Sequence, residues 1–400
     1  MRIGILTFHR SYNYGAYMQC FSLVKRIEKE FPEHSIEVID YNSVKAFQRY
    51  DNEILKYPEE ERDKVKQRNE QFIPCQEELP LSKKKIISDQ MDEVVQYMNE
   101  NYDIVIAGSD AIWNWNVRGF PNIWFLKDYN GIKMSYAASV HGMIYQNMTE
   151  EQKQYVKESL NDFRYIGVRD ITTEEFVEYA APGLTVHHNC DPTMFLNTED
   201  VPCDIKQLKD KLQRCGVDFT KPLIGVMAEN RTYAKMIKQK YGNKVQLVAV
   251  YEPNPYADIY INDLNPYEWA KVFSFFKVTV THFFHGTMLS LVNNTPVIPI
   301  EFITAFSAKN TTKIKDLMTR MELTDWRREA DYRKMNIIMK ALKKYGFYVD
   351  RKLWNDVYAG IDDMLNNDYS NLICEKKEKE RKSSDSFFDE LRKIIKENGE

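Results

Sequence analysis

Two histidines stand where chemistry is expected, between a β-branched run and an apolar run in KVTVTHFFHGTMLSLVNNTPVIPI, residues 277–300. VTVT predicts a strand, and MLSLVNN predicts a helix that begins near the second histidine. A helix N-terminus offers unpaired N–H groups that attract anions, and an imidazole beside them can move a proton near neutral pH. We expect His285 and the amides of Gly286 and Thr287 to form such a site, and His282, flanked by aromatic residues, to be structural.

Polar and turn-forming residues also follow the first and third predicted strands. In parallel α/β domains, ligands bind at the carboxyl ends of the strands, so these residues are candidates for a ligand site. The first loop precedes a helix N-terminus, which attracts anions, and the second either caps the next helix or contacts a ligand hydroxyl. The candidates are Asn13, Tyr14 and Gly15 in the first loop, and Ser109 and Asp110 in the second.

Two basic residues are further candidates. Arg169 follows the predicted strand RYIGV, where a guanidinium suits a carboxylate or phosphate ligand. The alternative is an ion pair within the domain, with Asp170 or Asp191. Lys313 is one of three lysines at the start of a predicted amphipathic helix, and the alternative there is a solvated helix face.

Three tryptophans surround the loop that contains Ser109. Aromatic side chains can stack on a sugar ring, but at this spacing they are also typical of a hydrophobic core. The sequence leaves both roles open for Trp113, Trp115 and Trp124.

The elements that must position these residues form two βα series, which predict an α/β fold with parallel sheets. The first has strands near residues 2–8, 36–41, 102–107, 133–139, 164–168 and 185–188, and helices beginning near Ala16, Lys84, Thr149 and Thr172. The second has strands near residues 222–227, 244–250, 277–281 and 296–300, and helices beginning near Arg231, Pro266, Gly286 and Thr311. We place one domain at residues 1–196, a second at 197–345 and a helical extension at 346–400.

Composition excludes several classes of protein. The net charge of −4 and the absence of a long basic block argue against nucleic-acid binding. No apolar run approaches the length of a membrane span, and MRIGILTF reads as a buried strand, so we expect a cytoplasmic protein. The six cysteines are widely spread, and no His, Cys, Asp or Glu spacing is typical of a metal site, so we expect no disulfide and no metal.

Two segments fall outside the βα pattern. Residues 50–85 are highly charged, and they are interpreted either as a solvated insertion or as a mobile excursion that covers a cleft. The last segment, SFFDELRKIIKENGE, has an apolar helical stripe and a polar face of mixed charge. We expect this helix to dock on its own chain or on a partner subunit rather than on an anionic bilayer.

In order and approximate spacing, six blocks of this chain resemble those of the polysaccharide pyruvyl transferases. They are NYGAYMQCFSL, YDIVIAGSDAIWN, MSYAASVH, IGVRD, CDPTMFL and THFFHGTMLSLVNNTPVI, and they extend from the first strand towards Leu323. Several short matches in a fixed order are more specific than any single one.

The resemblance implies a GT-B-like fold, in which two Rossmann-like domains face a central cleft and a C-terminal helical segment returns to the first domain. It also implies a reaction in which phosphoenolpyruvate and a sugar diol give a cyclic pyruvate ketal and phosphate, without a cofactor. Matching motif positions assign proton transfer to His285 and donor binding to Arg169 and Lys313, with the amides of Gly286 and Thr287. Across the cleft, the first domain would hold the sugar, with Asp110 as its base.

Family analogy further implies a surface or capsular polysaccharide precursor as acceptor, which can be lipid-linked and bring the protein to the inner membrane face. The chain also departs from the family pattern. Many relatives read Thr-Asp-Ser-Phe-His-Gly where this chain reads THFFHG, so the Asp and Ser are lost. Other relatives carry Arg two residues before the motif histidine, and Phe283 takes that place here. These changes leave two alternatives open, a nucleotide-sugar glycosyltransferase on the same architecture and a non-catalytic component of polysaccharide assembly.

Overall fold

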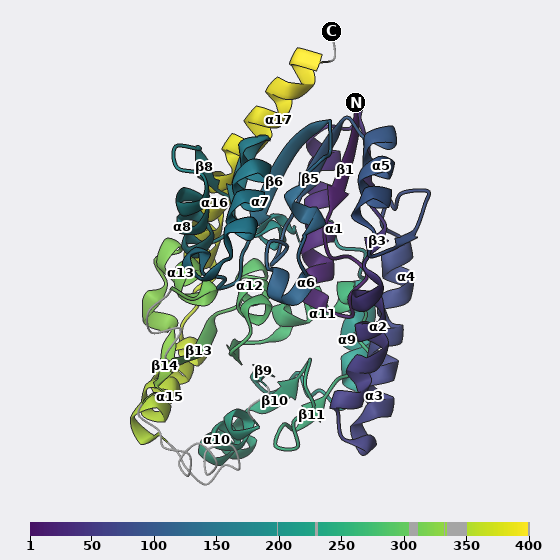
Figure 1. The fold of residues 1–400 in the computed structure, drawn as a ribbon. Helices are drawn as coiled ribbons and strands as arrows, with labels where there is room; N and C mark the ends of the chain where they lie inside the picture. Colours follow the sequence, from purple (N-terminus) through teal and green to yellow (C-terminus); the bar gives the residue numbers. More distant parts are fainter. Residues whose placement is uncertain (198, 229–230, 304–310, 332, 334–349, 399–400) are drawn as a thin grey trace. The chain divides into compact units, whose positions relative to one another are not determined.

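The computed structural model describes residues 1–197, 199–228, 231–303, 311–331, 333 and 350–398 (Figure 1). It divides into two compact units, and the chain passes between them more than once. The first unit comprises Met1–Arg62, Phe72–Phe195 and Glu380–Glu400, and the second comprises Asp63–Gln71 and Leu196–Lys379.

The first unit is built on a six-stranded parallel sheet with the strand order β2-β1-β5-β6-β7-β8. Its strands are β1 (Arg2–Leu6), β2 (Ser35–Val38), β5 (Ile104–Ala107), β6 (Ile132–Ala138), β7 (Phe163–Val168) and β8 (Val186–His188). The order reverses between β1 and β5. Ligands of open α/β sheets bind at such a reversal, outside the carboxyl ends of the strands.

Helices connect these strands, and a small second sheet pairs β3 (Tyr41–Asn42) with β4 (Ile86–Ile87). The helices of the first unit include α1 (Tyr14–Glu30), α2 (Val44–Asn52), α4 (Phe72–Glu77), α5 (Met91–Asn101), α6 (Trp115–Arg118), α7 (Glu150–Asn161), α8 (Ile171–Ala180) and α17 (Asp385–Asn398). Helix α3 (Glu59–Glu70) begins in the first unit, and most of it belongs to the second.

The second unit repeats the architecture with the strand order β11-β10-β9-β12-β13-β14, again parallel. Its strands are β9 (Leu223–Met227), β10 (Gln246–Ala249), β11 (Ile259–Tyr260), β12 (Val278–Thr281), β13 (Val297–Ile303) and β14 (Arg328–Asp331). Its helices include α9 (Ile205–Arg214), α10 (Thr232–Tyr241), α11 (Pro266–Val272), α12 (Phe284–Val292), α13 (Lys313–Arg320), α15 (Arg351–Asn366) and most of α16 (Ser370–Arg381). Here the order reverses between β9 and β12.

The strands form because their residues suit burial on both faces. Parallel strands covered by helices on each side read as continuous apolar runs rather than alternating ones. Strand β5, with the sequence IVIA, and strand β9, with the sequence LIGVM, are buried at every position. The predicted α/β class with parallel sheets and a C-terminal helical segment is therefore confirmed.

Some elements differ from the prediction. Helix α5 begins at Met91 rather than near Lys84, because residues 86–87 pair with β3 as β4. Strands β11 and β14 were not predicted, since one has two residues and the other has the polar sequence READ. The extension expected from residue 346 differs too, because α15 packs in the core of the second unit through residues such as Trp354 and Val357. The first unit resumes only at Glu380.

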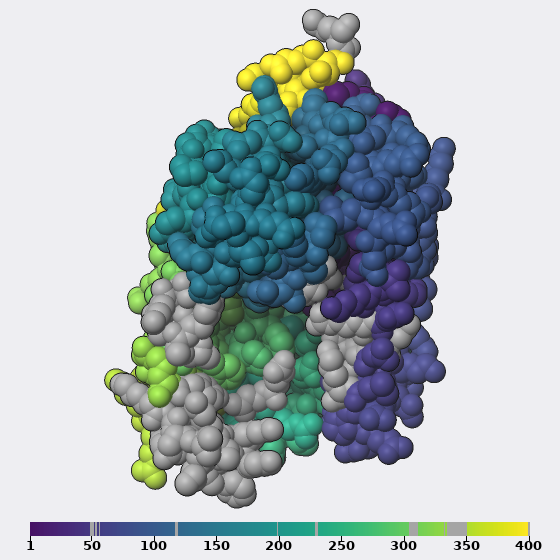
Figure 2. All heavy atoms as spheres, in the orientation of Figure 1, coloured from purple at the N-terminus to yellow at the C-terminus, as the bar shows by residue number. Residues whose placement is uncertain are grey.

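Helix α17 docks on the first unit, as one of the two expected alternatives proposed. Its apolar face is buried at Phe387, Phe388, Leu391 and Ile394, where the Phe387 ring packs edge-on against Tyr136 at 4.8 Å. Figure 2 shows this helix, in yellow, beside the surface of the same unit. The stripe is thus occupied by its own chain in this structure.

Candidate functional site

The carboxyl end of β12 carries the first group of candidates. The strand ends at Thr281, and α12 begins three residues later, with no side chain capping its N-terminus at Phe283. His285 lies in the first turn of α12, half-buried, with its ring edge-on to Phe284 at 5.3 Å. The first N–H groups of a helix lack intrahelical partners and carry partial positive charge. This turn therefore combines oriented amides with an imidazole.

Lys313 is brought to the same turn by a different helix. It is the first residue of α13, and its ammonium nitrogen lies over the Phe284 ring, 5.3 Å from the ring centroid. A cation at this distance from an aromatic face is attracted by the ring quadrupole. Lys313 and His285 thus both contact the ring of Phe284, although 28 positions separate them in the sequence.

A buried carboxylate helps to position Lys313. Glu301 of β13 is only 7% exposed; it accepts a hydrogen bond from the Thr312 hydroxyl and a charged one from Arg327 Nη1 at 2.8 Å. Thr312 in turn caps α13 by accepting from the Lys315 N–H at 3.1 Å. Because the cap lies next to Lys313, Glu301 holds the start of this helix against the sheet.

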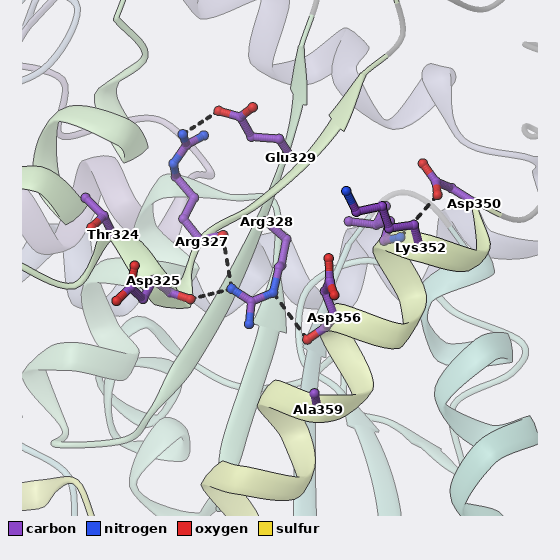
Figure 3. A pocket seen from close by; sticks show the side chains of 10 residues that line it. Thr324, Asp325, Arg327, Arg328, Glu329, Asp350, Lys352, Asp356 and Ala359 are labelled. Atoms are coloured by element: carbon purple, nitrogen blue, oxygen red, sulfur yellow. Dashed lines mark hydrogen bonds and ion pairs between the residues drawn. The ribbon is translucent and has the colours of Figure 1, made fainter.

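Arg327 also lines a hollow of about 580 Å³ between β14 and α15, shown in Figure 3. Its guanidinium bonds to Glu329 there, and Arg328 donates to the backbone oxygens of Asp325 and Asp356. The hollow contains no residue predicted for the site. Among the described residues that line it, acidic and basic side chains are of nearly equal number, so these residues supply no excess positive charge for an anion.

The two residues after His285 have different roles. A Cβ on Gly286 would lie 2.6 Å from Thr281 Oγ1 and 2.8 Å from Met227 Sδ, so only glycine lets α12 approach the sheet this closely. The Thr287 N–H already donates to the Phe283 carbonyl at 3.1 Å. In this conformation the Gly286 amide can face an anion, whereas the Thr287 amide, which we expected to do so, is occupied within the helix.

His282 is enclosed by aromatic rings, as its flanking residues led us to expect. Its ring centroid lies 4.1 Å from that of Phe283, 5.6 Å from Phe302 and 6.3 Å from Tyr233. Burial lowers the pKa of His282 to about 4, so the ring is neutral at pH 7. Among the described residues, no group forms a hydrogen bond with its buried Nδ1.

Sequence reasoning missed an arginine from the charged segment at residues 50–85. Arg68 of α3 is buried and stacks on Tyr251 at 5.1 Å, while its Nη1 donates to the Tyr251 carbonyl at 3.4 Å. Tyr251 packs edge-on against Phe283 at 5.3 Å, next to the start of α12. At Arg68, therefore, the segment packs on the second unit rather than being fully solvated. Periodicity gave no signal, because α3 has only three buried positions.

In the first unit, the loop after β1 serves mainly to start α1. Asn13 caps this helix through Oδ1, which accepts from the N–H groups of Gly15 at 2.9 Å and Ala16 at 3.2 Å. Tyr14 is buried, and its ring packs on Phe72 at 4.5 Å. The capping role accounts for the Asn13 side chain, and contact with an acceptor sugar stays a prediction.

The same edge holds a charged cluster that was not predicted. His9 is buried just after β1, and its ring nitrogens lie 3.2 Å from the Thr7 carbonyl and 2.9 Å from Asp40 Oδ1. Arg10 binds the same carboxylate through two nitrogens. Although burial alone would raise it, the hydrogen bonds and charges of His9 and Arg10 hold the pKa of Asp40 well below its usual range. The signal was the adjacent His-Arg pair at the end of a strand.

The loop after β5 places Ser109 and Asp110 beside Arg169. Gly108 is required there, because its φ is +130° and a Cβ would lie 2.1 Å from the Tyr136 carbonyl oxygen. Ser109 is 1% exposed, and its hydroxyl has no hydrogen-bond partner within the part of the chain that the structure describes. The Asp110 side chain is 20% exposed and lies 3.4 Å from Arg169 Nη2. These two candidates therefore share one corner of the sheet.

Arg169 is the centre of a buried ion-pair cluster. Its side chain is 1% exposed, and Nη1 donates to Asp191 Oδ2 at 3.0 Å. Burial would lower the pKa of Arg169, but the charges of Asp110, Asp191 and Asp170 outweigh it and raise the pKa. The structure shows the intradomain ion pair that was the alternative reading. Direct contact of this guanidinium with phosphoenolpyruvate stays a prediction, and a substrate anion would compete with two carboxylates.

The tryptophans belong to the core rather than to a sugar site. Trp113, Trp115 and Trp124 are all buried, and Trp113 stacks on Phe125 at 5.2 Å. Within the described ranges, no group of three His, Cys, Asp or Glu side chains is arranged to hold a metal ion. None of the described helices combines the length and the apolar character needed to cross a bilayer.

Comparison with protein families gives a match to the polysaccharide pyruvyl transferase model over residues 13–302. The chain belongs to the polysaccharide pyruvyl transferase family. The match contains His285, Arg169, Asn13, Ser109 and Asp110, whereas Lys313 lies just beyond it. A comparison with curated protein sequences gives no match.

Among solved structures, the chain of this pyruvyl transferase family member is similar to UDP-GlcNAc 2-epimerase from Methanocaldococcus jannaschii. The TM-score is 0.52 at 9% identity, over 92% of this chain and 93% of that chain. A UDP-N-acetylglucosamine 2-epimerase from Listeria monocytogenes, described as putative, gives 0.47 at 14% identity, over 89% and 90% of the two chains. ADP-heptose LPS heptosyltransferase II from E. coli gives 0.43 at 13%, over 92% and 99%. The similarity to the first of these structures shows a shared fold, and the predicted class of two Rossmann-like α/β domains is confirmed.

Proposed function

We propose that this protein transfers pyruvate from phosphoenolpyruvate to two hydroxyls of a sugar in a surface or capsular polysaccharide precursor, forming a cyclic ketal and releasing phosphate. Family membership supports pyruvylation of a polysaccharide in general. The observation that carries the specific proposal is the cluster at the start of α12. There Lys313 and His285 both contact Phe284, and the N-cap residue Phe283 makes no side-chain capping bond.

Phosphoenolpyruvate is a compact anion with a carboxylate and a phosphate, so its site must supply positive charge and oriented donors. Lys313 supplies a full charge, and the Gly286 N–H supplies an amide at the positive end of the helix. The Arg that other relatives carry before the motif histidine is replaced by Phe283, so Lys313 bears more of the charge neutralisation here. In this proposal, Arg169 forms an ion pair with Asp110 and does not contact phosphoenolpyruvate.

The chemistry requires one proton to be added to carbon and two to be removed from hydroxyls. His285 donates a proton to C3 of the enol, which leaves positive charge at C2. The first sugar hydroxyl attacks C2 and loses its proton, phosphate leaves with the C2–O electron pair, and the second hydroxyl closes the ring. The two hydroxyl protons balance the one added to C3 and the one taken up by phosphate. A positioned general acid contributes about 10²- to 10⁴-fold to such a step.

On the acceptor side, we propose that Asp110 accepts the proton of the attacking hydroxyl. Its carboxylate is partly exposed, in contrast to the buried Ser109 and Arg169 next to it. The Arg169 guanidinium lies 3.4 Å from the Asp110 carboxylate and can hold it in place for this role. Ser109 and Asn13 remain proposed contacts of the sugar.

Calorimetric titration of phosphoenolpyruvate tests the donor assignment. Lys313→Ala should weaken binding by about tenfold or more, whereas the matched control Lys315→Ala, an exposed lysine two residues further along α13, should leave it unchanged. Equal affinity in both variants would remove Lys313 from the site. Binding of a UDP-sugar with no binding of phosphoenolpyruvate would instead favour glycosyl transfer.

A further inference from the structure

A polar pocket of about 410 Å³ lies at the amino ends of the strands in the second unit's sheet, whereas His285 lies at their carboxyl ends. It is formed where β12 and β13 begin and where α15 ends, and its lining includes Lys277, Pro296 and Asn366. His285 lies beyond the carboxyl end of β12, so the four-residue strand, which spans about 13 Å, separates the two places. The pocket therefore does not belong to the site described above.

Amide side chains dominate the polar lining of this pocket. Asn293, Asn294, Asn366 and Asn367 all line it, together with Ser274, Thr295 and Ser370. Each amide and hydroxyl can donate and accept a hydrogen bond, and this matches a ligand that carries many hydroxyl groups. Few other ligand classes use so many neutral polar groups at once.

The hydrogen bonds of Asn366 and Asn367 determine which atoms of their side-chain amides can bind a ligand. The NH₂ groups of Asn366 and Asn367 donate to the backbone carbonyls of Asp362 at 2.7 Å and Asp363 at 3.2 Å. Because a carbonyl can only accept, these contacts orient the amides with their own oxygens turned away. Neither oxygen accepts a hydrogen bond from the residues that the structure describes. Both residues are exposed, so a ligand hydroxyl can reach these acceptors.

A third amide oxygen is left over inside the pocket wall. Asn293 donates to the carbonyls of Ala270 and Leu289, both at 2.8 Å, and its Oδ1 is buried with no partner among the described residues. Buried polar atoms in native proteins almost always have a partner, whether protein, water or ligand. Because this oxygen is enclosed within the wall, the exposed oxygens of Asn366 and Asn367 are the acceptors that a ligand can reach.

An aromatic wall completes the pocket. Tyr369 is held edge-on to Trp326 at 5.2 Å, and its hydroxyl donates to Asp363 Oδ2 at 2.5 Å. These contacts fix the ring, and an immobilised aromatic face is suited to pack against the C–H face of a sugar. The combination of aromatic face and amide acceptors is typical of carbohydrate recognition.

The charges favour a neutral ligand. Among the described residues, the lining has one basic residue, Lys277, and one acidic residue, Asp368, so their charges offset each other. Asp368 also accepts from the Ser370 N–H at 2.9 Å. A phosphorylated ligand would find a single cation next to a carboxylate, and a divalent cation would be repelled by the lysine.

We propose that this pocket binds a neutral oligosaccharide and so holds a sugar chain at a place remote from the chemistry. The occupancy does not depend on which donor the protein uses. Since a polysaccharide precursor extends beyond the sugar that reacts, a second sugar site on the enzyme would retain the polymer between encounters with the reactive site.

Saturation-transfer NMR on the full chain tests this, with maltotriose, cellotriose, chitotriose and mannotriose as probes. At least one should bind with a dissociation constant on the order of 1 mM, and Asn366→Ala/Asn367→Ala should weaken it by about tenfold. The matched control is Asn161→Ala, since Asn161 also ends a helix and donates to a carbonyl four residues earlier, at 2.7 Å. This control should bind like the parent.

Further variants separate this proposal from the proposed function. His285→Ala should bind the trisaccharide as the parent does, because the pocket lies at the other edge of the sheet. Ser274→Trp, at an exposed position on the rim, should block the pocket without touching the helix ends. No binding of any of the four probes to the parent, equal binding in the blocked variant, or loss of binding in His285→Ala would each overturn the proposal.

Discussion

The ammonium of Lys313 and the ring of Phe284 lie 5.3 Å apart, and this contact joins two segments of the second unit. Phe284 is buried at the first position of α12, so its ring forms a fixed platform beside His285. Lys313 is the first residue of α13, where the Thr312 cap restrains its backbone. The relationship brings a lysine from outside the family match to the same aromatic ring as the motif histidine.

Replacing Phe284 should weaken the binding of phosphoenolpyruvate less than replacing Lys313. Phe284→Leu keeps an apolar side chain but removes the π face, so phosphoenolpyruvate affinity should fall by about two- to fivefold, which corresponds to about 0.5–1 kcal/mol. Isothermal calorimetry of the variant beside Lys313→Ala measures this. A larger loss in Phe284→Leu than in Lys313→Ala would show that the ring, rather than the charge, determines affinity.

Replacing the acid–base group should affect turnover rather than binding. His285→Gln retains a polar side chain of similar length, so phosphoenolpyruvate should bind within about twofold of the parent, while phosphate release in the presence of the acceptor should fall about 10²- to 10⁴-fold. A variant with unchanged turnover would exclude His285 from proton transfer.

The sequence allowed correct predictions where a structural feature depends on residues that are close together in the chain. Apolar runs in the strands, the Asn13 cap and the order of the βα units all depend on residues close in the chain. The ion pair of Arg169 with Asp191 was one of the alternatives read from the sequence, but its second partner was not predicted, because Asp110 comes from another loop. The position of Arg68 on Tyr251 depended on a segment without apolar periodicity, which a pattern-based analysis leaves unassigned.

Removing the buried guanidinium should lower stability. Arg169→Met leaves the fully buried carboxylate of Asp191 without its charged partner, and breaking a buried pair in this way costs about 3–5 kcal/mol in the free energy of unfolding. Arg164→Met on the same strand is the matched control. Its ion pairs with Glu390 and Glu397 are largely exposed, so it should cost less than about 1 kcal/mol.

Urea unfolding of both Arg variants gives the comparison. If Arg169 instead binds phosphoenolpyruvate directly, as the family motif implies, Arg169→Met should unfold at the parent's urea concentration and lose donor binding. Similar stability in Arg169→Met and Arg164→Met would therefore contradict the ion-pair role. A less stable Arg169→Met that still binds the donor would support it.

The buried imidazole of His282 should make stability depend on pH. Its pKa is about 4 in the folded protein and near 6.5 in the unfolded chain, so between these values the unfolded state binds more protons. The free energy of unfolding should therefore fall as the pH decreases from about 6.5 towards 4, and His282 should have no effect above that window. His282→Phe removes the group and suits the surrounding rings of Phe283 and Phe302. Unfolding measured in urea from pH 4 to 8 should show a shallower decline in His282→Phe than in the parent, and parallel curves would mean that His282 is not buried in its neutral form.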